Sequence, residues 1–232
     1  MSNRIHPTAI VGAGVILGRD NTIGPFTVIV GPCEIGDGNW LGPFASIGTP
    51  AEYRGGAHPV GWEGEVEGAG VLIGDGNTIR DFVTINQGTE ETTTIGDDCY
   101  LLARSHVGHD CVLHDGVTLA DGVQLGGHTQ VWAWTNIGMG TVVHQRTNVG
   151  PGAMIGMGSA VRRDVRPFTI TVGNPARAIG VNHVGLSRRG CTEDEVAALE
   201  TYLKGKAELP ANLPSGLADT LAAWAKAAGE QG

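Results

Sequence analysis

Aliphatic residues recur at every sixth position along most of this chain. The positions run without a gap from Ile5 to Ile47, return from Ile73 to Ile85, and continue from Ile95 to Val161. A period of six fits neither an α-helix, with about 3.6 residues per turn, nor a single strand, with a period of about two. It is typical of parallel β-helices built from hexapeptides, in which each hexad forms one short flat face. The pattern therefore predicts a β-helix over residues 1–178.

Three hexads should close one triangular coil of about 18 residues, and successive coils should stack about 4.8 Å apart. Glycine often follows the aliphatic residue, where it permits the bend between faces, and the fifth hexad position is small or polar. The fold class that we predict is all-β, a parallel β-helix with a C-terminal α-helical extension.

The hexad pattern breaks at two places. The aliphatic residue after Ile47 is Ile73, 26 residues later, and the one after Ile85 is Ile95, ten residues later. We therefore predict loop insertions at about residues 49–72 and 89–94. The first is long enough to be either functional or disordered.

Residues 179–232 are predicted to form the helical extension. Thr192 and Glu195 have the spacing of a capping box ahead of an apolar-periodic stretch that ends at Leu203. A second short helix is expected over residues 217–228, with Trp224 on its apolar side. We expect the helices to cover the open end of the β-helix, because an exposed last coil would offer unpaired strand edges.

Composition narrows the functional class. The chain has 232 residues, 41% of them hydrophobic, and no long apolar run, so we expect one sizeable core and no membrane span. Residues 1–4 hold no segment that resembles a signal peptide, which predicts a cytoplasmic protein. A net charge of -9 argues against nucleic acid as a partner. Three of the four cysteines occupy the fifth hexad position, where buried thiols are expected rather than disulfides.

One segment of this acidic chain is basic. Residues 162–189 contain six arginines and one acid, Asp164, which gives a local net charge of +5. Two interpretations stay open. The segment is either a solvated arginine-rich edge or a cradle for phosphates or an acidic carrier protein, since arginine binds phosphate through two parallel hydrogen bonds.

Four of the eight histidines gather near one column of the predicted coil, where position 109 stacks on positions 127 and 145. These are His106, His109, His128 and His144. A general base near neutral pH is most often an imidazole whose tautomer is fixed by a partner. Asp110 is either that partner for His109 or only a turn residue. We predict a functional histidine cluster at this edge.

These histidines belong to an ordered set of motifs. The set comprises Ser105–Cys111, Leu125–His128, Val143–Gln145, Gly180–Asn182 and Arg188–Gly190, together with Ile5–Ala9 and Ile79–Ile85. In this order they resemble the UDP-N-acetylglucosamine O-acyltransferases that begin lipid A synthesis, over about residues 5–205. The resemblance implies a left-handed β-helix, although most parallel crossovers are right-handed.

The resemblance also implies an activity. His109, with Asp110 beside it, would be the general base that deprotonates a sugar hydroxyl or amine as it attacks an acyl thioester, and the Gly127 N–H would stabilise the oxyanion. The donor would be an acyl-carrier-protein or coenzyme A thioester, and the acceptor a nucleotide-linked amino sugar such as UDP-N-acetylglucosamine. The protein would be a homotrimer with active sites between subunits. It would use the phosphopantetheine-linked donor as a co-substrate and would need no cofactor and no metal.

The substrate-binding residues that the resemblance implies are His106, His128, His144, Gln145, Asn182, Arg188, Arg189 and Met157. The histidines and the glutamine would hold the sugar and the pantetheine arm, and the asparagine and arginines would face nucleotide phosphate or carrier. Met157 falls at a position where bulk favours shorter acyl chains, although a methionine can also simply fill a gap.

Two positions depart from the family pattern. The first large loop normally carries a Gln-Asp-x-Lys-Tyr type motif, but here it reads Pro50–Gly55. The usual glutamate two positions after Asn182 is Val184. Both lie in the part of the site that recognises the nucleotide and the sugar, so the identity of the acceptor sugar stays open.

Two other classes compete with the acyltransferase. Gly108–His114 resembles the paired-histidine segment of γ-type carbonic anhydrases, which share this fold and bind zinc between subunits. Zinc needs three protein ligands and an open fourth position, and the third ligand would be expected near Asn86, a poor substitute. The other class is a non-catalytic β-helix scaffold, against which the intact histidine column argues.

Overall fold

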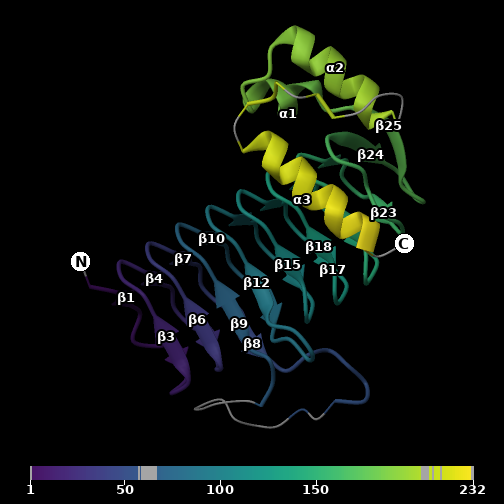
Figure 1. Ribbon diagram of the computed structural model, residues 1–232. Coiled ribbons are helices and arrows are strands. Elements are labelled where there is room, and N and C mark those ends of the chain that lie inside the picture. The colour runs from purple at the N-terminus through teal and green to yellow at the C-terminus, as the bar shows by residue number, and fades with distance from the viewer. Residues whose placement is uncertain are drawn as a thin grey trace.

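The computed structural model describes residues 2–56, 58, 67–204, 209–210, 212–214 and 216–230. It forms a triangular parallel β-helix with the N-terminus at one end and the helices at the other (Figure 1). The predicted left-handed β-helix with a helical extension is confirmed. Within the predicted loop at 49–72, residues 57 and 59–66 lie outside the described residues.

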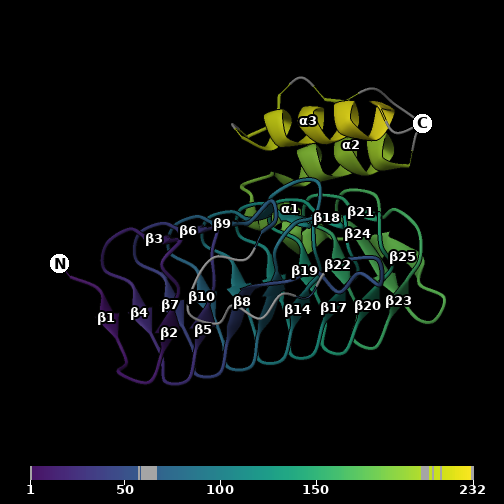
Figure 2. The same ribbon diagram turned by 90° about the horizontal axis from the view of Figure 1, so that it is seen from below.

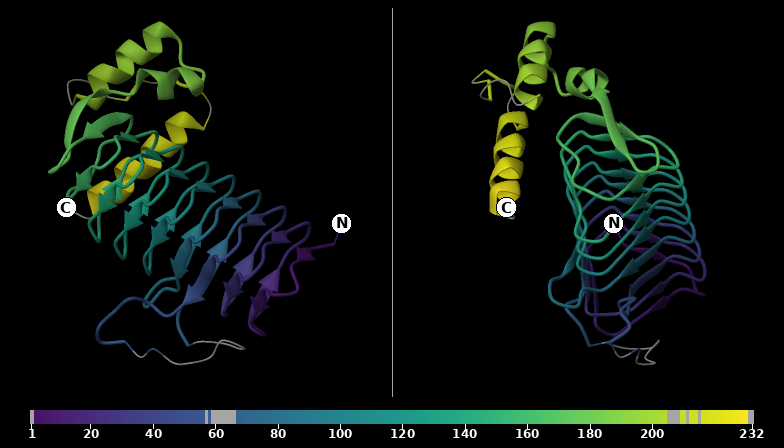
Figure 3. Two further views of the ribbon diagram at one scale, coloured as in Figure 1. Left: turned by 180° about the vertical axis from the view of Figure 1, so that it is seen from behind. Right: turned by 90° about the vertical axis from the view of Figure 1, so that its right-hand side faces the viewer.

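Three parallel sheets form the sides of the prism, and the chain visits them in turn (Figure 3). The first sheet contains β1 (Arg4–Ile5), β4 (Thr22–Ile23), β7 (Trp40–Leu41), β10 (Thr78–Ile79), β13 (Tyr100–Leu101), β16 (Thr118–Leu119), β19 (Asn136–Ile137), β22 (Met154–Ile155), β24 (Thr169–Val172) and β25 (Arg177–Val181). The second contains β2 (Ile10–Val11), β5 (Val28–Ile29), β8 (Ser46–Thr49), β11 (Thr84–Asn86), β14 (His106–Val107), β17 (Gln124–Leu125), β20 (Val142–Val143) and β23 (Ala160–Val161). The third contains β3 (Val15–Leu17), β6 (Cys33–Ile35), β9 (Val71–Ile73), β12 (Thr93–Ile95), β15 (Val112–Leu113), β18 (Gln130–Val131) and β21 (Asn148–Val149).

The aliphatic residue of each hexad points into the prism. From Ile23 to Val161 these side chains are at most 4% exposed, whereas Ile5 in the first coil is 44% exposed. Parallel pairing places each one against its equivalent in the next coil, as Val107 pairs with Leu125. Burial of each such side chain contributes about 1.5–3 kcal/mol, so the repeat is also the source of the core.

Three corners join the sheets. The phenylalanine corner joins the first sheet to the second and includes residues 24–27, 42–45, 80–83, 102–105 and 156–159. The histidine corner joins the second to the third and includes residues 108–111, 126–129, 144–147 and 162–164. The helix corner joins the third to the first and includes residues 96–99, 114–117, 132–135 and 150–153.

Three helices follow the last coil: α1 (His183–Arg188), α2 (Glu193–Leu203) and α3 (Leu217–Glu230). The predicted capping box of α2 is confirmed, because the Thr192 hydroxyl accepts the Glu195 N–H and the Glu195 carboxylate accepts the Thr192 N–H. Trp224 of α3 is half-buried. No helix in the described part of the chain is long and apolar enough to cross a membrane.

The helices pack on one side of the prism, where Figure 2 shows α2 and α3 together. Their apolar side chains, among them Leu186, Leu199 and Leu221, form a second core with Phe168, and Trp134 of the helix corner packs against it. We keep the division into 1–178 and 179–232 as a proposal. The boundary falls inside β25, which pairs antiparallel with β24.

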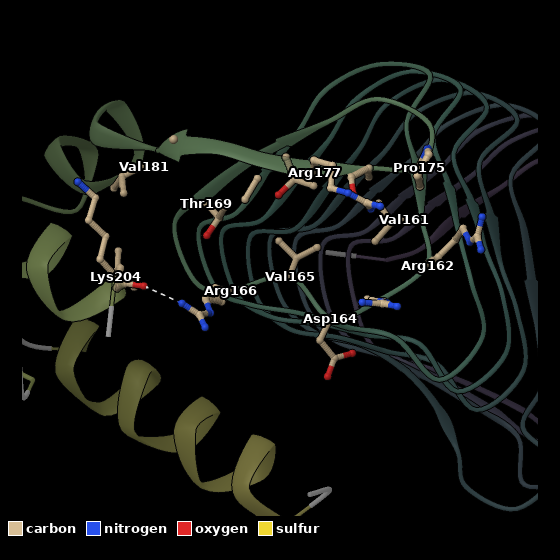
Figure 4. Close-up of a pocket in the computed structure, with 16 residues that line it drawn as sticks. Val161, Arg162, Asp164, Val165, Arg166, Thr169, Pro175, Arg177, Val181 and Lys204 are labelled. Carbon is tan, nitrogen blue, oxygen red and sulfur yellow. Dashed lines mark hydrogen bonds between the residues drawn. The ribbon is translucent and has the colours of Figure 1, made fainter. Parts of the chain in front are cut away.

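The helices do not close the whole end of the β-helix. The β24 and β25 hairpin prolongs the first sheet only, and the second and third sheets end at β23 and β21. A cavity of about 830 Å³ lies at this end, lined by residues from Val161 to Lys204 (Figure 4). The helices therefore pack on a side of the prism, and the expectation that they cover its open end is not met at the second and third sheets.

Candidate functional site

His109 lies at the histidine corner, between β14 and β15. Its Nδ1 is 2.5 Å from Asp110 Oδ2, and its side chain is 16% exposed. An ionised carboxylate only accepts hydrogen bonds, so the proton of the neutral His109 ring lies on Nδ1 and the lone pair on Nε2. No described residue hydrogen-bonds to Nε2, which can therefore accept a proton from a ligand.

Asp110 is held by the loop inserted between β11 and β12. Its Oδ1 accepts the N–H groups of Thr89, Glu90 and Glu91 at 2.7–2.9 Å, and its Oδ2 accepts the Thr89 hydroxyl at 2.8 Å. Burial alone would raise the pKa of Asp110, but these bonds and His109 outweigh it and hold the pKa well below its usual value. Asp110 is thus an ionised anchor for His109 and not only a turn residue.

Gly127 lies one coil from His109. A Cβ atom built on Gly127 would stand 2.6 Å from both Cε1 and Nε2 of the His109 ring, so no side chain fits between them. Within the described chain, the Gly127 N–H has no acceptor. This geometry leaves a backbone donor beside the free nitrogen of the imidazole.

His128 and Arg146 follow on the same corner. The His109 and His128 rings meet edge to face with centroids 5.1 Å apart, and His128 Nε2 is 3.7 Å from Asp110 Oδ2. Arg146 Nη2 lies 3.3 Å from the same Nε2. A guanidinium only donates, so Nε2 of His128 accepts and its proton lies on Nδ1. Arg146 is not among the residues predicted for the site, although its spacing of 18 residues from position 128 predicts this contact.

The other predicted residues of this corner lie nearby. His106 Nδ1 is 2.8 Å from the Thr84 hydroxyl, and burial lowers the pKa of His106, with a further lowering from His109. His144 is exposed, and its Nδ1–H donates to the Gln145 carbonyl at 3.0 Å. The histidine corner and the adjoining strand β14 therefore carry all four predicted histidines, together with Asp110 and Arg146.

The remaining predicted residues lie at the other two corners. Arg188 and Arg189 line a cavity of about 670 Å³ at the helix corner, and the Arg189 guanidinium lies 4.9 Å from the centre of the Trp134 ring. Met157 is at the phenylalanine corner and is 78% exposed. Within one protomer the structure does not bring these residues to the histidines.

Asn182 has a structural partner at each end of its amide. It is the N-cap of α1, where its Oδ1 accepts the Gly185 N–H at 2.9 Å. Its Nδ2 donates to the Gly152 carbonyl at 2.9 Å. Asn182 thus ties α1, and with it Arg188 and Arg189, to the helix corner.

The metal-binding potential of the site is limited by its charges. Donor atoms of His109, Asp110 and His128 all lie within 4.8 Å of one another, which would suit a cation. The Asp110 oxygens, however, already accept bonds from the loop and from His109, and the Arg146 guanidinium contacts His128. His114, the second histidine of the carbonic-anhydrase-like segment, instead stacks on Trp132 with ring centroids 4.3 Å apart.

The cysteines do not offer a nucleophile. All four are free and buried, as expected for the three that occupy hexad positions, Cys33, Cys99 and Cys111. Burial raises the pKa of Cys33 and Cys111 to about 12 and that of Cys99 to about 11. A thiol needs to be deprotonated to attack a carbonyl, so these groups are inert at neutral pH.

Comparisons with known proteins show which family the chain resembles. Residues 164–205 match the family profile described as UDP N-acetylglucosamine O-acyltransferase, domain 2, and residues 92–127 match the bacterial transferase hexapeptide profile. The acyl-[acyl-carrier-protein]–UDP-N-acetylglucosamine O-acyltransferase of Burkholderia thailandensis is 39% identical over 149 residues, which are 63% of this chain and 57% of that protein. The match thus spans less than two thirds of the length of such curated relatives.

Solved structures match over most of both chains. The UDP-N-acetylglucosamine O-acyltransferase of Moraxella catarrhalis superimposes with a TM-score of 0.73 and 27% identity, over 97% of this chain and 91% of that one. The UDP-N-acetylglucosamine acyltransferase of Campylobacter jejuni gives a TM-score of 0.67 and 32% identity, over 90% of this chain and 85% of that one. From the repeat, the histidine corner and these matches together, we conclude that the chain belongs to the UDP-N-acetylglucosamine O-acyltransferase family.

Proposed function

We propose that this protein transfers an acyl group from an acyl-carrier-protein thioester, or from acyl coenzyme A, to a hydroxyl or amine of a nucleotide-linked amino sugar such as UDP-N-acetylglucosamine. The observation that carries the proposal is the His109 and Asp110 pair with a free Nε2 beside the Gly127 N–H. The names of the relatives supply the donor and acceptor classes.

The geometry supports general-base catalysis. His109 Nε2 accepts the proton of the attacking O–H or N–H while the oxygen or nitrogen bonds to the thioester carbonyl carbon, and Asp110 stabilises the resulting imidazolium. The Gly127 N–H donates to the oxyanion. The imidazolium then returns the proton to the departing thiolate. A positioned base adds about 10²–10⁴-fold, and neither a metal nor an organic cofactor is required beyond the phosphopantetheine-linked donor.

The division of the predicted residues among three corners supports a homotrimer. The histidine corner holds the base, whereas the helix corner holds Asn182, Arg188 and Arg189. We place the helix corner of one protomer against the histidine corner of the next, so that the two arginines reach the nucleotide phosphates. His106, His128, His144 and Gln145 then hold the sugar and the pantetheine arm. The reaction would take place in the cytoplasm.

The experiment that tests this function is a mass analysis of products. The purified protein is incubated with a panel of acyl-carrier-protein and coenzyme A thioesters and a panel of nucleotide sugars. We expect one acceptor mass to rise by the mass of the acyl group, and EDTA to leave the rate unchanged. Absence of acyl transfer with every pair contradicts the proposal, and loss of activity in EDTA with recovery in zinc would favour a metal site of the carbonic anhydrase type.

Met157 is proposed to limit the length of the acyl chain. Met157→Gly should shift donor preference toward longer chains, because each additional buried methylene contributes about 0.8 kcal/mol. The measurement is kcat/KM across a donor series of increasing length, with Met139→Gly as the control because Met139 is an exposed methionine of the same corner. An unchanged donor profile in Met157→Gly would show that this side chain is only packing.

A further inference from the structure

The turn that presents N–H groups to Asp110 is itself held by a distant part of the chain. It runs from Gly88 to Thr93, the first residue of β12. The Gly88 N–H donates to the Gly70 carbonyl at 3.0 Å, and the Thr93 N–H donates to the same carbonyl at 3.2 Å. One carbonyl thus draws the two ends of the turn together.

Residues 67–70 end the long insertion of the β-helix, and we call them the clamp segment. Ala69 within it also bonds to the turn. Its N–H donates to the Gly88 carbonyl at 3.1 Å, and its carbonyl accepts the Thr92 hydroxyl at 2.9 Å. In the described part of the chain, the Thr92 bond is the contact between clamp segment and turn that a side chain makes. Thr92 is therefore the place where this contact can be removed by substitution.

Gln87 holds the other end of the clamp segment. It is 2% exposed, and its Nε2 donates to the Glu67 carbonyl at 3.2 Å. The fit is close, because a Cβ atom built on Gly68 would stand 2.3 Å from Gln87 Oε1. This Oε1 is buried and has no hydrogen-bond partner among the described residues, which lowers stability. Gln87 thus serves stability poorly, and its role lies in what its Nε2–H holds.

The turn connects the clamp segment to the catalytic pair. The N–H groups of residues 89–91 converge on Asp110 Oδ1 at 2.7–2.9 Å. At the end of the turn, the Thr93 hydroxyl accepts the Asp110 N–H at 2.9 Å. The clamp segment, the turn and Asp110 are therefore one hydrogen-bonded unit, and this unit ends at His109 Nδ1.

We propose that Thr92 and Gln87 are positioning residues for acyl transfer. They fix the clamp segment against the turn, and the turn fixes the Asp110 carboxylate that orients the His109 ring. The inference rests on the proposed function, because it assumes that His109 is the base. Loosening the clamp leaves the base present but misaligned, so kcat falls and KM stays nearly unchanged.

The direct test is amide hydrogen exchange at residues 89–91. Thr92 is exposed, so Thr92→Val removes its hydroxyl without disturbing the core. Exchange should become about fivefold faster in Thr92→Val, as expected for the loss of one hydrogen bond, and should return to the wild-type rate in Thr92→Ser. The control Thr201→Val removes an exposed hydroxyl that donates to the Ala197 carbonyl in α2, and should leave these amides unchanged.

Nitrogen-15 resonances of the His109 ring give a second measurement that needs no catalysis. The wild type should show the Nδ1–H tautomer, and Thr92→Val should show a share of the Nε2–H tautomer. Wild-type exchange rates together with a wild-type His109 spectrum in Thr92→Val would overturn the proposal. Both results stand even if the protein transfers no acyl group, an outcome that would contradict the proposed function alone.

Kinetics show whether the clamp acts through Asp110. Thr92→Val should lower kcat by about fivefold with KM unchanged, and Thr92→Ser should restore it. Gln87→Met, which keeps the side-chain length and removes the donor, should behave as Thr92→Val does. In the Asp110→Asn background, Thr92→Val should lower kcat no further, because the carboxylate that the clamp positions is gone. A further fivefold loss in that background would overturn the proposal, and so would a wild-type kcat in both Thr92→Val and Gln87→Met.

Discussion

The phenylalanine and histidine corners use the same backbone turn for different purposes. At the phenylalanine corner the turn residues include Phe26, Phe44 and Phe82, with φ between 56° and 59°. At the histidine corner they are Asp110, His128 and Arg146, with φ of 58–59°. Left-handed φ costs a residue with a side chain about 1–2 kcal/mol, so the coil imposes this geometry at both corners regardless of side-chain type.

The side chains at this position decide what each corner does. The three phenylalanine rings stack with centroids 5.1 and 5.0 Å apart, so the ladder repeats one apolar contact. At the histidine corner, a carboxylate, an imidazole and a guanidinium follow one another at 3.7 and 3.3 Å. Identical residues in a column stabilise neighbouring coils, and unlike residues in a column build a site.

The largest expected effect comes from the base. His109→Asn should lower turnover by about 10²–10⁴-fold. The melting temperature should stay nearly unchanged, because the asparagine amide can still donate to Asp110. Turnover is measured with saturating donor and acceptor, and thermal unfolding by circular dichroism. A folded variant with wild-type turnover would show that His109 is not the base.

The next largest effect is expected at Asp110, which anchors His109. Asp110→Asn should lower both turnover and the free energy of unfolding, the latter by about 1–3 kcal/mol, because buried loop N–H groups and the Thr89 hydroxyl lose a charged acceptor. The folded-state pKa of Asp110 lies below its unfolded value, so its stabilisation is present above about pH 4 and is lost as pH falls further.

Urea unfolding of wild type and Asp110→Asn at pH 7 and at pH 3 measures this difference. The difference in unfolding free energy between the two proteins should be smaller at pH 3. A difference that does not change with pH would show that the anchor acts through packing and not through its charge.

A smaller effect is expected at Arg146. Arg146→Ala should lower turnover by about tenfold, because the His128 ring can then adopt the Nε2–H tautomer and donate to Asp110 Oδ2, which lies 3.7 Å away, and this contact competes with that of His109. Nitrogen-15 resonances of His128 should report the Nδ1–H tautomer in the wild type and a share of the Nε2–H tautomer in the variant.

Arg146→Lys is the matched variant, since it keeps the charge and a donor. It should retain the Nδ1–H tautomer of His128. Identical His128 spectra in the wild type and Arg146→Ala would contradict the assignment of the tautomer to Arg146.

The smallest effect on activity is expected at the phenylalanine corner. Phe44→Ala should leave turnover unchanged and lower the free energy of unfolding by about 1 kcal/mol or more, since Phe44 stacks on both Phe26 and Phe82. The same unfolding and turnover assays apply. A loss of turnover comparable to that of His109→Asn would remove the distinction between the two corners.

Much of the histidine corner could be predicted from residue spacing. A repeat of 18 residues places Gly127 over His109 and His128 beside them, and the structure confirms that these residues meet. Arg146 obeys the same spacing. The contacts of Asp110 with Thr89, Glu90 and Glu91 do not follow from any repeat, because the loop that supplies them is an insertion whose path depends on the carboxylate that it surrounds.

In the helical extension, too, some contacts can be predicted from the sequence and others cannot. The capping box of α2 is a local pattern, so its four residues suffice to predict it. The resemblance assigns Asn182 to substrate binding, whereas its contacts with Gly152 and Gly185 depend on how α1 packs against the helix corner.

The sequence by itself determined the prism, because a six-residue aliphatic period can be buried only if successive hexads form the faces of one coil. It also determined which residues stack, since stacking follows the 18-residue coil. Only the tertiary structure decided how the N–H groups of residues 89–91 hold Asp110 and lower its pKa. It also decided that β24 and β25 leave an arginine-lined cavity at the end of the histidine corner. These features depend on contacts between segments that share no period, and such contacts exist only once the chain has folded.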